Sequence, residues 1–352
     1  MTVPATLTTR DERMPAAYSD RLEDLSLAPL WTALHALLPK ERGVTRVVPH
    51  RWRWAEVRPE LLAAARLVGI EDAERRVLVL RNPGLGGAYA ATATLFAGLQ
   101  IILPGEKAPS HHHTPAALRL IVEGRGAFTT VDGVKCLMEP GDLIITPPMR
   151  WHDHGHEGTE PVVWLDGLDI PLVRSLDQSW ASAMRPAAPP HTATDSSQDE
   201  FTAAGLVPHR PRQAATGYPQ VRWPWRTVRP ALEALAAAVP APEPVVMRYV
   251  DPTTGRPPLP TLGCEARWLR PGETTPAERR ASSSVWLVVE GRGETRVGDQ
   301  AFSWEPGDCL AAPPWQWIEH ENASPRAPAC LFAFTDEPVL RALGLWHEER
   351  RA

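Results

Sequence analysis

The chain has 352 residues, which is enough for about two domains with a core of good size. Its formal net charge of −5 provides no basic surface, which argues against nucleic acid as a partner. No apolar run approaches the ~20 residues that cross a bilayer, and the N-terminus lacks the basic and apolar regions of a signal peptide. The four cysteines show no CxxC spacing, so we expect reduced thiols in a cytoplasmic protein with no membrane partner.

The N-terminal part of the chain is expected to be helical and extended. Apolar residues recur at helical spacing over residues 20–38, interrupted at Pro29. A short helix is predicted over residues 59–68, with Pro59 in its first turn. From about Val77 the apolar period shortens toward two, which indicates that strands begin there.

Short strands separated by Gly, Pro or Asp predict a small antiparallel barrel or sandwich, for example over residues 118–122, 127–131 and 143–146. Residues 185–200 have the composition of an exposed linker. The elements expected after it are a helix over residues 230–239, a proline-rich extended stretch over 240–260, a second barrel over about 262–334 and a last helix over 338–345. We therefore predict an all-β fold with added helices, divided into residues 1–85, 86–175, 176–260 and 261–352.

The chain contains one passage twice, and an internal repeat means that one fold is used twice. The offset between the copies is 167 residues up to the second glycine pair (122 to 289) and 166 afterwards (142 to 308), so one residue was lost between them. The matching stretches are Pro104-Gly105-Glu106 with Pro271-Gly272-Glu273, Val122-Glu123-Gly124-Arg125-Gly126 with Val289-Glu290-Gly291-Arg292-Gly293, Glu139-Pro140-Gly141-Asp142 with Glu305-Pro306-Gly307-Asp308, and Trp151-His152-Asp153-His154 with Trp317-Ile318-Glu319-His320.

The first copy carries histidines in a pattern that suits a metal ion. His111 and His113 are two residues apart on a predicted strand, so they project to the same face. His152 is placed to add a third ligand from a later, neighbouring strand, and His112 would point to the opposite face. Neutral imidazoles suit iron, zinc, copper or nickel. The alternative is a set of surface histidines, or an accident that resembles an expression tag.

The second copy lacks these ligands, because His111 aligns with Glu278, His113 with Arg280 and His152 with Ile318. We therefore expect one barrel with a metal site and one structural barrel without a metal.

These residues resemble the cupin superfamily. Gly105-x5-His111-x-His113 fits its first motif, and Gly141, Pro147 and His152 fit its second motif loosely. The glutamate of the first motif is missing, and Leu118 and Arg119 stand at its place. Further stretches are similar to the bicupin ring-cleaving dioxygenases, namely gentisate 1,2-dioxygenase, salicylate 1,2-dioxygenase and 1-hydroxy-2-naphthoate dioxygenase. Those stretches are Leu95-Phe96-Ala97-Gly98-Leu99-Gln100, Ala117-Leu118-Arg119, Trp151-His152-Asp153-His154-Gly155 and Trp164-Leu165-Asp166-Gly167-Leu168-Asp169-Ile170-Pro171-Leu172.

The resemblance implies a bicupin fold, with two tandem jelly-roll barrels after an N-terminal helical extension. It also implies Fe(II) held by three histidines without the cupin glutamate, O2 as co-substrate, and a small aromatic hydroxy acid as substrate. Ring cleavage would fall between the carboxyl-bearing and the hydroxyl-bearing carbons. The family's second cupin commonly lacks a metal, and the resemblance points to a homotetramer.

Five further side chains are candidates for contact with the substrate or the reaction. Arg119 stands where a cupin ligand would be and can hold a carboxylate bidentately; the alternative is an exposed strand arginine. His154 shares a strand face with His152 and is a candidate general acid or base; the alternative, a core histidine, is favoured by His320 in the metal-free copy. Asp166 is expected to orient a neighbour or to be a turn residue. Gln100 is a candidate donor to the substrate, and Phe96 a candidate wall of the ring pocket or a core residue.

Three readings of function stay open on the sequence. The first is cleavage of gentisate, and the second is cleavage of a substituted salicylate or 1-hydroxy-2-naphthoate at the same iron site. Leu120 and Phe96 hint at a modified pocket, because relatives often carry larger or hydroxylated aromatic residues there. The third is a non-catalytic or sensor cupin that binds an aromatic acid.

Overall fold

A computed structural model of the chain describes residues 13–40, 43–182, 193–195, 201 and 218–351. The chain divides into two compact units, residues 1–46 and residues 47–352. The first unit contains α1 (Ala16–Asp24) and α2 (Leu30–Leu37), with Pro29 at the N-cap of α2. The predicted helical stretch over residues 20–38 and its interruption at Pro29 are therefore confirmed. Part of the expected linker over residues 185–200 lies outside the described residues.

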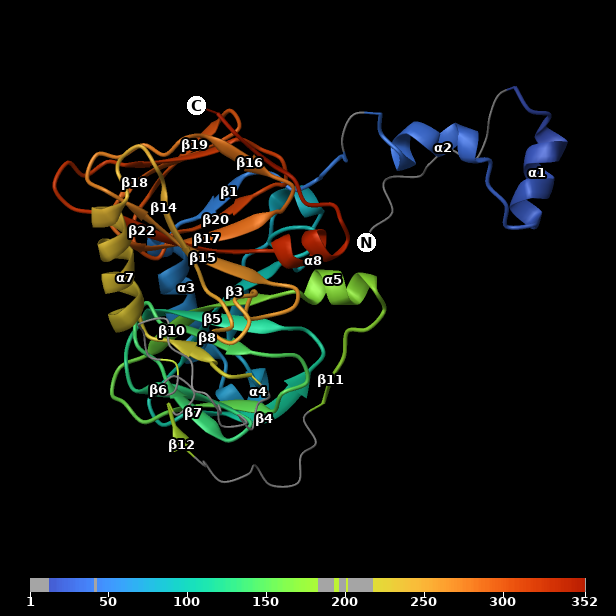
Figure 1. The fold of residues 1–352 in the computed structure, drawn as a ribbon. Helices are drawn as coiled ribbons and strands as arrows, with labels where there is room; N and C mark the ends of the chain where they lie inside the picture. Colours follow the sequence, from blue (N-terminus) through green and yellow to red (C-terminus); the bar gives the residue numbers. More distant parts are fainter. Residues whose placement is uncertain (1–12, 41–42, 183–192, 196–200, 202–217, 352) are drawn as a thin grey trace. The chain divides into compact units, whose positions relative to one another are not determined.

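The second unit contains two β-barrels, each built from two facing sheets whose strands are antiparallel except for the parallel pair β7 and β12 (Figure 1). The two sheets of the first barrel have the strand orders β13-β8-β5-β10-β3-β2 and β11-β4-β9-β6-β7-β12. Their bounds are β2 Val77–Val79, β3 Phe96–Ile102, β4 Lys107–His113, β5 Ala117–Glu123, β6 Ala127–Val131, β7 Val134–Leu137, β8 Leu143–Thr146, β9 His152–His156, β10 Val162–Leu168, β11 Ala181–Ser182, β12 Ala193–Thr194 and β13 Arg222–Trp223. The strands predicted over residues 118–122, 127–131 and 143–146 are confirmed as β5, β6 and β8.

The second barrel repeats this arrangement, with the strand orders β1-β20-β17-β22-β15-β14 and β19-β18-β21-β16-β23. Its bounds are β1 His50–Trp52, β14 Val245–Arg248, β15 Gly263–Leu269, β16 Glu278–Arg280, β17 Ser284–Glu290, β18 Gly293–Val297, β19 Gln300–Trp304, β20 Cys309–Ala312, β21 Ile318–Asn322, β22 Ala329–Thr335 and β23 Glu348–Arg350. The short helices of the unit are α4 Ile70–Ala73, η1 Pro83–Leu85, α5 Ile170–Ser175 and α8 Glu337–Ala342. The all-β fold with two tandem barrels and added helices, expected from the sequence, is confirmed.

Two longer helices begin earlier than the sequence predicts. Helix α3 spans Trp54–Leu67 and α7 spans Trp225–Ala238, so Pro59 and Pro230 lie inside the helices and do not open them. The expectation that Pro59 lies in the first turn was wrong, and so was the predicted start of the later helix at residue 230, because a tertiary contact fixes the start of each helix. The backbone N–H of Trp54 donates to Asp308 Oδ1 at 2.7 Å, and that of Trp225 donates to Asp142 Oδ1 at 2.7 Å.

One strand of each barrel comes from the segment of the chain that leads into the other barrel. Strand β1 precedes the first barrel in sequence but pairs with β20 of the second, and β13 precedes the second barrel but pairs with β8 of the first. The segments begin with the same pattern, Arg51-Trp52-x-Trp54 and Arg222-Trp223-x-Trp225. The expected boundaries at residues 85, 175 and 260 stay a prediction, and these strand pairings cross them.

Reciprocal side-chain hydrogen bonds also join the two barrels. Thr261 Oγ1 donates to Asp169 Oδ2 at 2.5 Å, and Thr94 Oγ1 donates to Asp336 Oδ2 at 2.6 Å. Such paired contacts are those of a two-fold interface between two copies of one unit. One continuous apolar cluster contains buried residues of both barrels, including Leu118 of β5 and Phe334 of β22. The first barrel is therefore held in place by the second.

Candidate metal centre

Strands β4 and β9 bring the three predicted histidines together inside the first barrel. His111 lies directly opposite His152 in the strand register, and His113 lies two residues further along β4. One potential ligand atom from each of the three residues lies within 4.8 Å of the others. His112 takes the other face of β4, where its ring stacks on Trp151 with centroids 4.1 Å apart. The described part of the chain offers this one cluster of candidate metal ligands.

Backbone carbonyl groups orient two of the rings for a metal. His113 Nδ1 lies 2.7 Å from the carbonyl of Pro115, and His152 Nδ1 lies 2.9 Å from the carbonyl of Arg150. Each Nδ1 therefore carries the proton, which leaves the lone pair on Nε2, the arrangement that metal-binding histidines use. Nε2 of His152 is buried and has no hydrogen-bond partner among the described residues. A bound cation would satisfy this nitrogen, so the residues fit a metal ion.

The histidines are uncharged at neutral pH. Burial, and next Arg75, lowers the pKa of His111 to about 2, and burial lowers the pKa of His113 to about 4. Burial and Arg119 hold the pKa of His152 well below the usual range. Neutral imidazoles are the form that binds metal ions, so no proton has to be displaced.

Arg75 is a residue of this site that the sequence analysis missed. It lies before β2, and its Nη2 group donates to Nδ1 of His111. Because a guanidinium is only a donor, a metal ion bound through either nitrogen of that ring would require Arg75 to move. The pair Arg75-Arg76 has no motif or spacing that distinguishes it, and only the packing of the barrel brings it to the histidines.

Arg119 and Asp166 face each other in the barrel interior. They are direct partners in the register of β5 and β10, and Nε of Arg119 lies 3.4 Å from Oδ1 of Asp166. Burial raises the pKa of Asp166 to about 6, although Arg119 and the indole of Trp164 act to lower it. The expected alternatives of an exposed strand arginine and a turn aspartate are wrong, because both side chains are more than nine-tenths buried within strands.

The remaining predicted residues lie on neighbouring strands. Gly98 of β3 is the partner of Asp166 in the register, so Phe96 and Gln100, two residues to either side, share its face. Nε2 of Gln100 is buried without a hydrogen-bond partner among the described residues. His154 of β9 is buried, and its ring centroid lies 6.0 Å from that of His152. Their roles in a reaction stay predictions.

The second barrel has a neutral group of charged residues at the equivalent place. Glu278 lies opposite Ile318 in the register, as His111 lies opposite His152. Arg280 bonds Glu265 at 2.9 Å, and Arg267 donates to Glu278. Burial opposes ionisation of Glu265, but Arg280 and Arg267 lower its pKa to about 2. Two carboxylates and two guanidinium groups thus fill the space where the first barrel gathers histidines.

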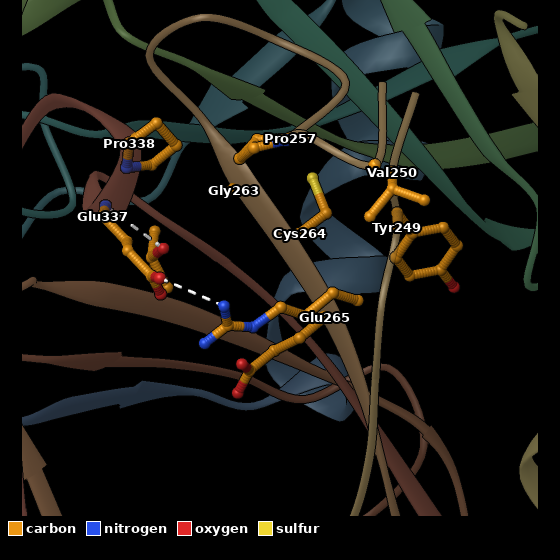
Figure 2. A pocket seen from close by; sticks show the side chains of 11 residues that line it. Tyr249, Val250, Pro257, Gly263, Cys264, Glu265, Glu337 and Pro338 are labelled. Carbon is orange, nitrogen blue, oxygen red and sulfur yellow. Dashed lines mark hydrogen bonds and ion pairs between the residues drawn. The ribbon is translucent and has the colours of Figure 1, made fainter. Parts of the chain in front are cut away.

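A cavity of about 70 Å³ lies in the second barrel beside this group, lined by Glu265, Cys264 and Glu337 among others (Figure 2). The side chains of Cys264 and Glu265 leave β15 in different directions, and Arg248 pairs with Glu337 at 3.4 Å. An apolar cavity of about 150 Å³ can hold one benzene molecule. The cavity in the second barrel has less than half of that volume.

Comparison with known proteins identifies the family. The model of the cupin domain family matches residues 98–168 and 269–335. A gentisate 1,2-dioxygenase from Ralstonia sp is 43% identical over 340 residues, which cover 96% of this chain and 95% of that protein. The chain belongs to the bicupin gentisate and salicylate 1,2-dioxygenase family.

Other members of the family agree with this assignment. A 5-aminosalicylate 1,2-dioxygenase from Comamonas sp is 38% identical, over 93% of this chain and 88% of that protein. A crystal structure of a variant of salicylate 1,2-dioxygenase from Pseudoaminobacter salicylatoxidans, in complex with gentisate, superposes with a TM-score of 0.89 at 30% identity, covering 99% of this chain and 98% of that chain.

The assignment makes this chain a ring-cleaving dioxygenase of the bicupin type, as the motifs predicted. None of the helices in the described part of the chain combines the length and apolar character that a membrane crossing needs.

Proposed function

We propose that the protein is an Fe(II)-dependent dioxygenase that opens the ring of gentisate or a salicylate-type acid between the carboxyl-bearing and the adjacent hydroxyl-bearing carbon. The observation that carries this proposal is the combination of three neutral histidines with a buried arginine–aspartate pair in one barrel. Three histidine ligands without a carboxylate leave the metal its full +2 charge and open positions for substrate and O2. Iron, when bound, supplies the electron transfer between the aromatic ring and O2 that insertion of both oxygen atoms requires.

The side chains around the histidines have separate tasks in this proposal. Arg119 binds the substrate carboxylate through its forked N–H groups, and Asp166 holds the guanidinium in place. His154 is neutral because burial and Arg119 keep its pKa well below the usual range, and one of its unpartnered ring nitrogens accepts a hydrogen bond from the substrate hydroxyl group. Gln100 donates a hydrogen bond from its unpartnered amide to a substrate oxygen. Phe96 forms part of the wall beside the aromatic ring.

The shape of the pocket wall limits the choice of substrate. Gly98 lets the side chains of Val77 and Phe96 pack against the backbone next to Asp166, because a Cβ atom there would lie only 2.5 Å from Val77 and 3.2 Å from Phe96. Salicylate lacks the para-hydroxyl group of gentisate, so a site that binds salicylate would orient its ring through such apolar contacts. We therefore propose gentisate and substituted salicylates as the first substrates to test, with 1-hydroxy-2-naphthoate as the larger alternative.

The test is oxygen consumption by protein loaded anaerobically with Fe(II), measured with gentisate, salicylate, 5-substituted salicylates and 1-hydroxy-2-naphthoate. Uptake of one O2 for each ring opened, lost in His113→Ala, is the expected result. Stoichiometric iron with no uptake on any of these acids would overturn the proposal and leave an aromatic-acid-binding cupin.

We also propose that the protein works in the cytoplasm as a homotetramer. Large apolar side chains in the N-terminal unit support association, since Leu30, Trp31 and Leu37 are each more than half exposed. Light scattering coupled to size exclusion measures the mass directly, and a monomer at micromolar concentration would contradict this part of the proposal.

A further inference from the structure

Four positions around Arg119 differ in character between the two barrels. In the first barrel their side chains are joined to one another by two hydrogen bonds and an ion pair, whereas in the second barrel three of the four are aliphatic and the fourth, Trp286, bonds to Ser284 outside the group. The strand registers pair Arg119 with Trp286, Thr146 with Ala312, Trp164 with Leu331 and Asp166 with Ala333. The repeat thus provides an internal comparison between a barrel with candidate metal ligands and one without.

In the first barrel these four side chains form one chain of contacts. Nη1 of Arg119 donates to Thr146 Oγ1 at 2.5 Å, and Nε of Arg119 lies 3.4 Å from Asp166 Oδ1. The indole Nε1–H of Trp164 donates to the same Asp166 oxygen at 3.0 Å. Thr146 and Trp164 are fully buried, so solvent does not compete for these bonds.

Residues with structural tasks are kept in both barrels. Asp142 and Asp308 each accept the backbone N–H of a tryptophan at a helix start. Asp169 and Asp336 each accept a backbone N–H group at equivalent positions, from Ala116 and from Ser283. The second barrel therefore lacks the equivalents of Arg119, Thr146 and Asp166 as well as the metal ligands, although it keeps the residues with structural tasks.

Packing alone does not account for Trp164, because Leu331 fills the equivalent position with a smaller apolar side chain. We propose that Thr146 and Trp164 are positioning residues for the carboxylate-binding arginine of the reaction. This inference rests on the proposed function of Arg119. Thr146 fixes one arm of the guanidinium, and Trp164 fixes the carboxylate that faces Nε, so the rest of the fork is held ready for a substrate carboxylate.

The fixed geometry matters because a long arginine side chain loses rotamer freedom when it binds. A guanidinium that is already held on two sides loses less rotamer freedom when the substrate binds, and the complex is therefore stronger. Removing either support leaves Arg119 in the barrel but lets its guanidinium rotate.

The experiment uses the full-length protein with Trp164→Phe and Thr146→Val, which each remove one hydrogen bond and keep most of the volume. Thr146→Ser restores the hydroxyl group. The matched control is Trp286→Phe, because this indole is equally buried and donates to Ser284 Oγ at 2.8 Å in the metal-free barrel. Two quantities are measured on Fe(II)-loaded protein: the Kd for salicylate or gentisate by anaerobic calorimetry, and KM and kcat by oxygen consumption.

We expect Trp164→Phe and Thr146→Val to raise Kd and KM by about ten-fold, the effect of a lost hydrogen bond to a charged group, with iron content unchanged. Thr146→Ser and Trp286→Phe stay within about two-fold of the wild type, which bounds the purely structural effect. Wild-type Kd in Trp164→Phe and Thr146→Val, or an equal loss in Trp286→Phe, would overturn the inference.

The two proposals fail in different ways. If the wild type binds an aromatic acid without oxygen uptake and the variants bind it more weakly, the proposed reaction is wrong and the positioning role stands. If the wild type consumes oxygen and the variants match it, the positioning role is wrong. A wild type that neither binds nor reacts overturns both.

Discussion

Trp54, at the start of the helix that leads into the first barrel, packs directly on Gly307 of the second barrel. A Cβ atom on Gly307 would lie 2.6 Å from Cγ of that indole, and the backbone there has φ +88°. Trp225 packs in the same way on Gly141 of the first barrel, where φ is +87°. Each barrel thus has a tryptophan of the other repeat packed on its Glu-Pro-Gly-Asp turn.

Gly307→Ala is expected to lower the stability of the whole unit. The substitution places an alanine at a strained backbone conformation and displaces Trp54 from its contact with residue 307. The free energy of unfolding is expected to fall by about 1–3 kcal/mol. Gly272→Ala is the matched control, because it has φ +67° but nothing within 4 Å of the added atom. Thermal unfolding of both variants separates the two effects. Equal melting temperatures would show that the tryptophan contact contributes nothing.

His113→Ala is expected to abolish stoichiometric metal binding, because it removes one of three ligands. His112→Ala is the natural control: its ring lies on the other face of the same strand, stacked on Trp151, and the variant is expected to keep its metal. Metal analysis after dialysis against Fe(II) under anaerobic conditions gives the result. Loss of metal in both variants would contradict the assignment of faces on β4.

Gly98→Ala is expected to reduce kcat/KM for all aromatic acids and to affect the bicyclic one most. The new methyl group would lie 2.5 Å from Cγ1 of Val77, so either that side chain shifts or the space beside Asp166 shrinks. The double variant Gly98→Ala with Val77→Ala removes the contact and should recover most of the loss, a coupling measurable in a double-mutant cycle. Additive effects would show that Val77 does not set the width of the site.

The activity is expected to fall when Asp166 is protonated. Its pKa is raised to about 6 by burial, so the carboxylate that faces Arg119 is ionised above that pH and neutral below it. A divalent cation bound nearby favours the ionised carboxylate and so opposes this rise, which places the inflection at or below about 6. The profile of kcat/KM against pH should therefore decline toward acid.

Asp166→Asn provides the control for this profile. It is expected to lower the plateau and to remove the inflection, since His154 stays neutral through the same range. The same acid decline in Asp166→Asn would assign the inflection to another group.

Part of the site followed from local patterns. The two-residue spacing of His111 and His113 fixes a common face on any strand, and the repeat placed His152 beside them. Arg119 was identified only because it replaces a ligand of the cupin motif. The repeated pattern of Arg51, Trp52 and Trp54 was also present in the sequence, and it would have placed the start of α3 correctly.

Other features depend on contacts between distant segments. Arg75 reaches His111, and Arg119 reaches Thr146 in a hydrogen bond, only because distant segments pack side by side in the first barrel. Arg75 has no neighbour in sequence that distinguishes it from a surface arginine, and Thr146 has none that distinguishes it from any other strand threonine.

The sequence by itself determined the doubled barrel and the difference between its two halves, because strand periodicity, turn glycines and metal-ligand spacing are local properties. The tertiary structure decided the exchange of β1 and β13 between the barrels, the start of α3 and the chain of bonds that holds Arg119. Those features depend on which segments pack together, and packing is a property of the whole fold that no local pattern contains.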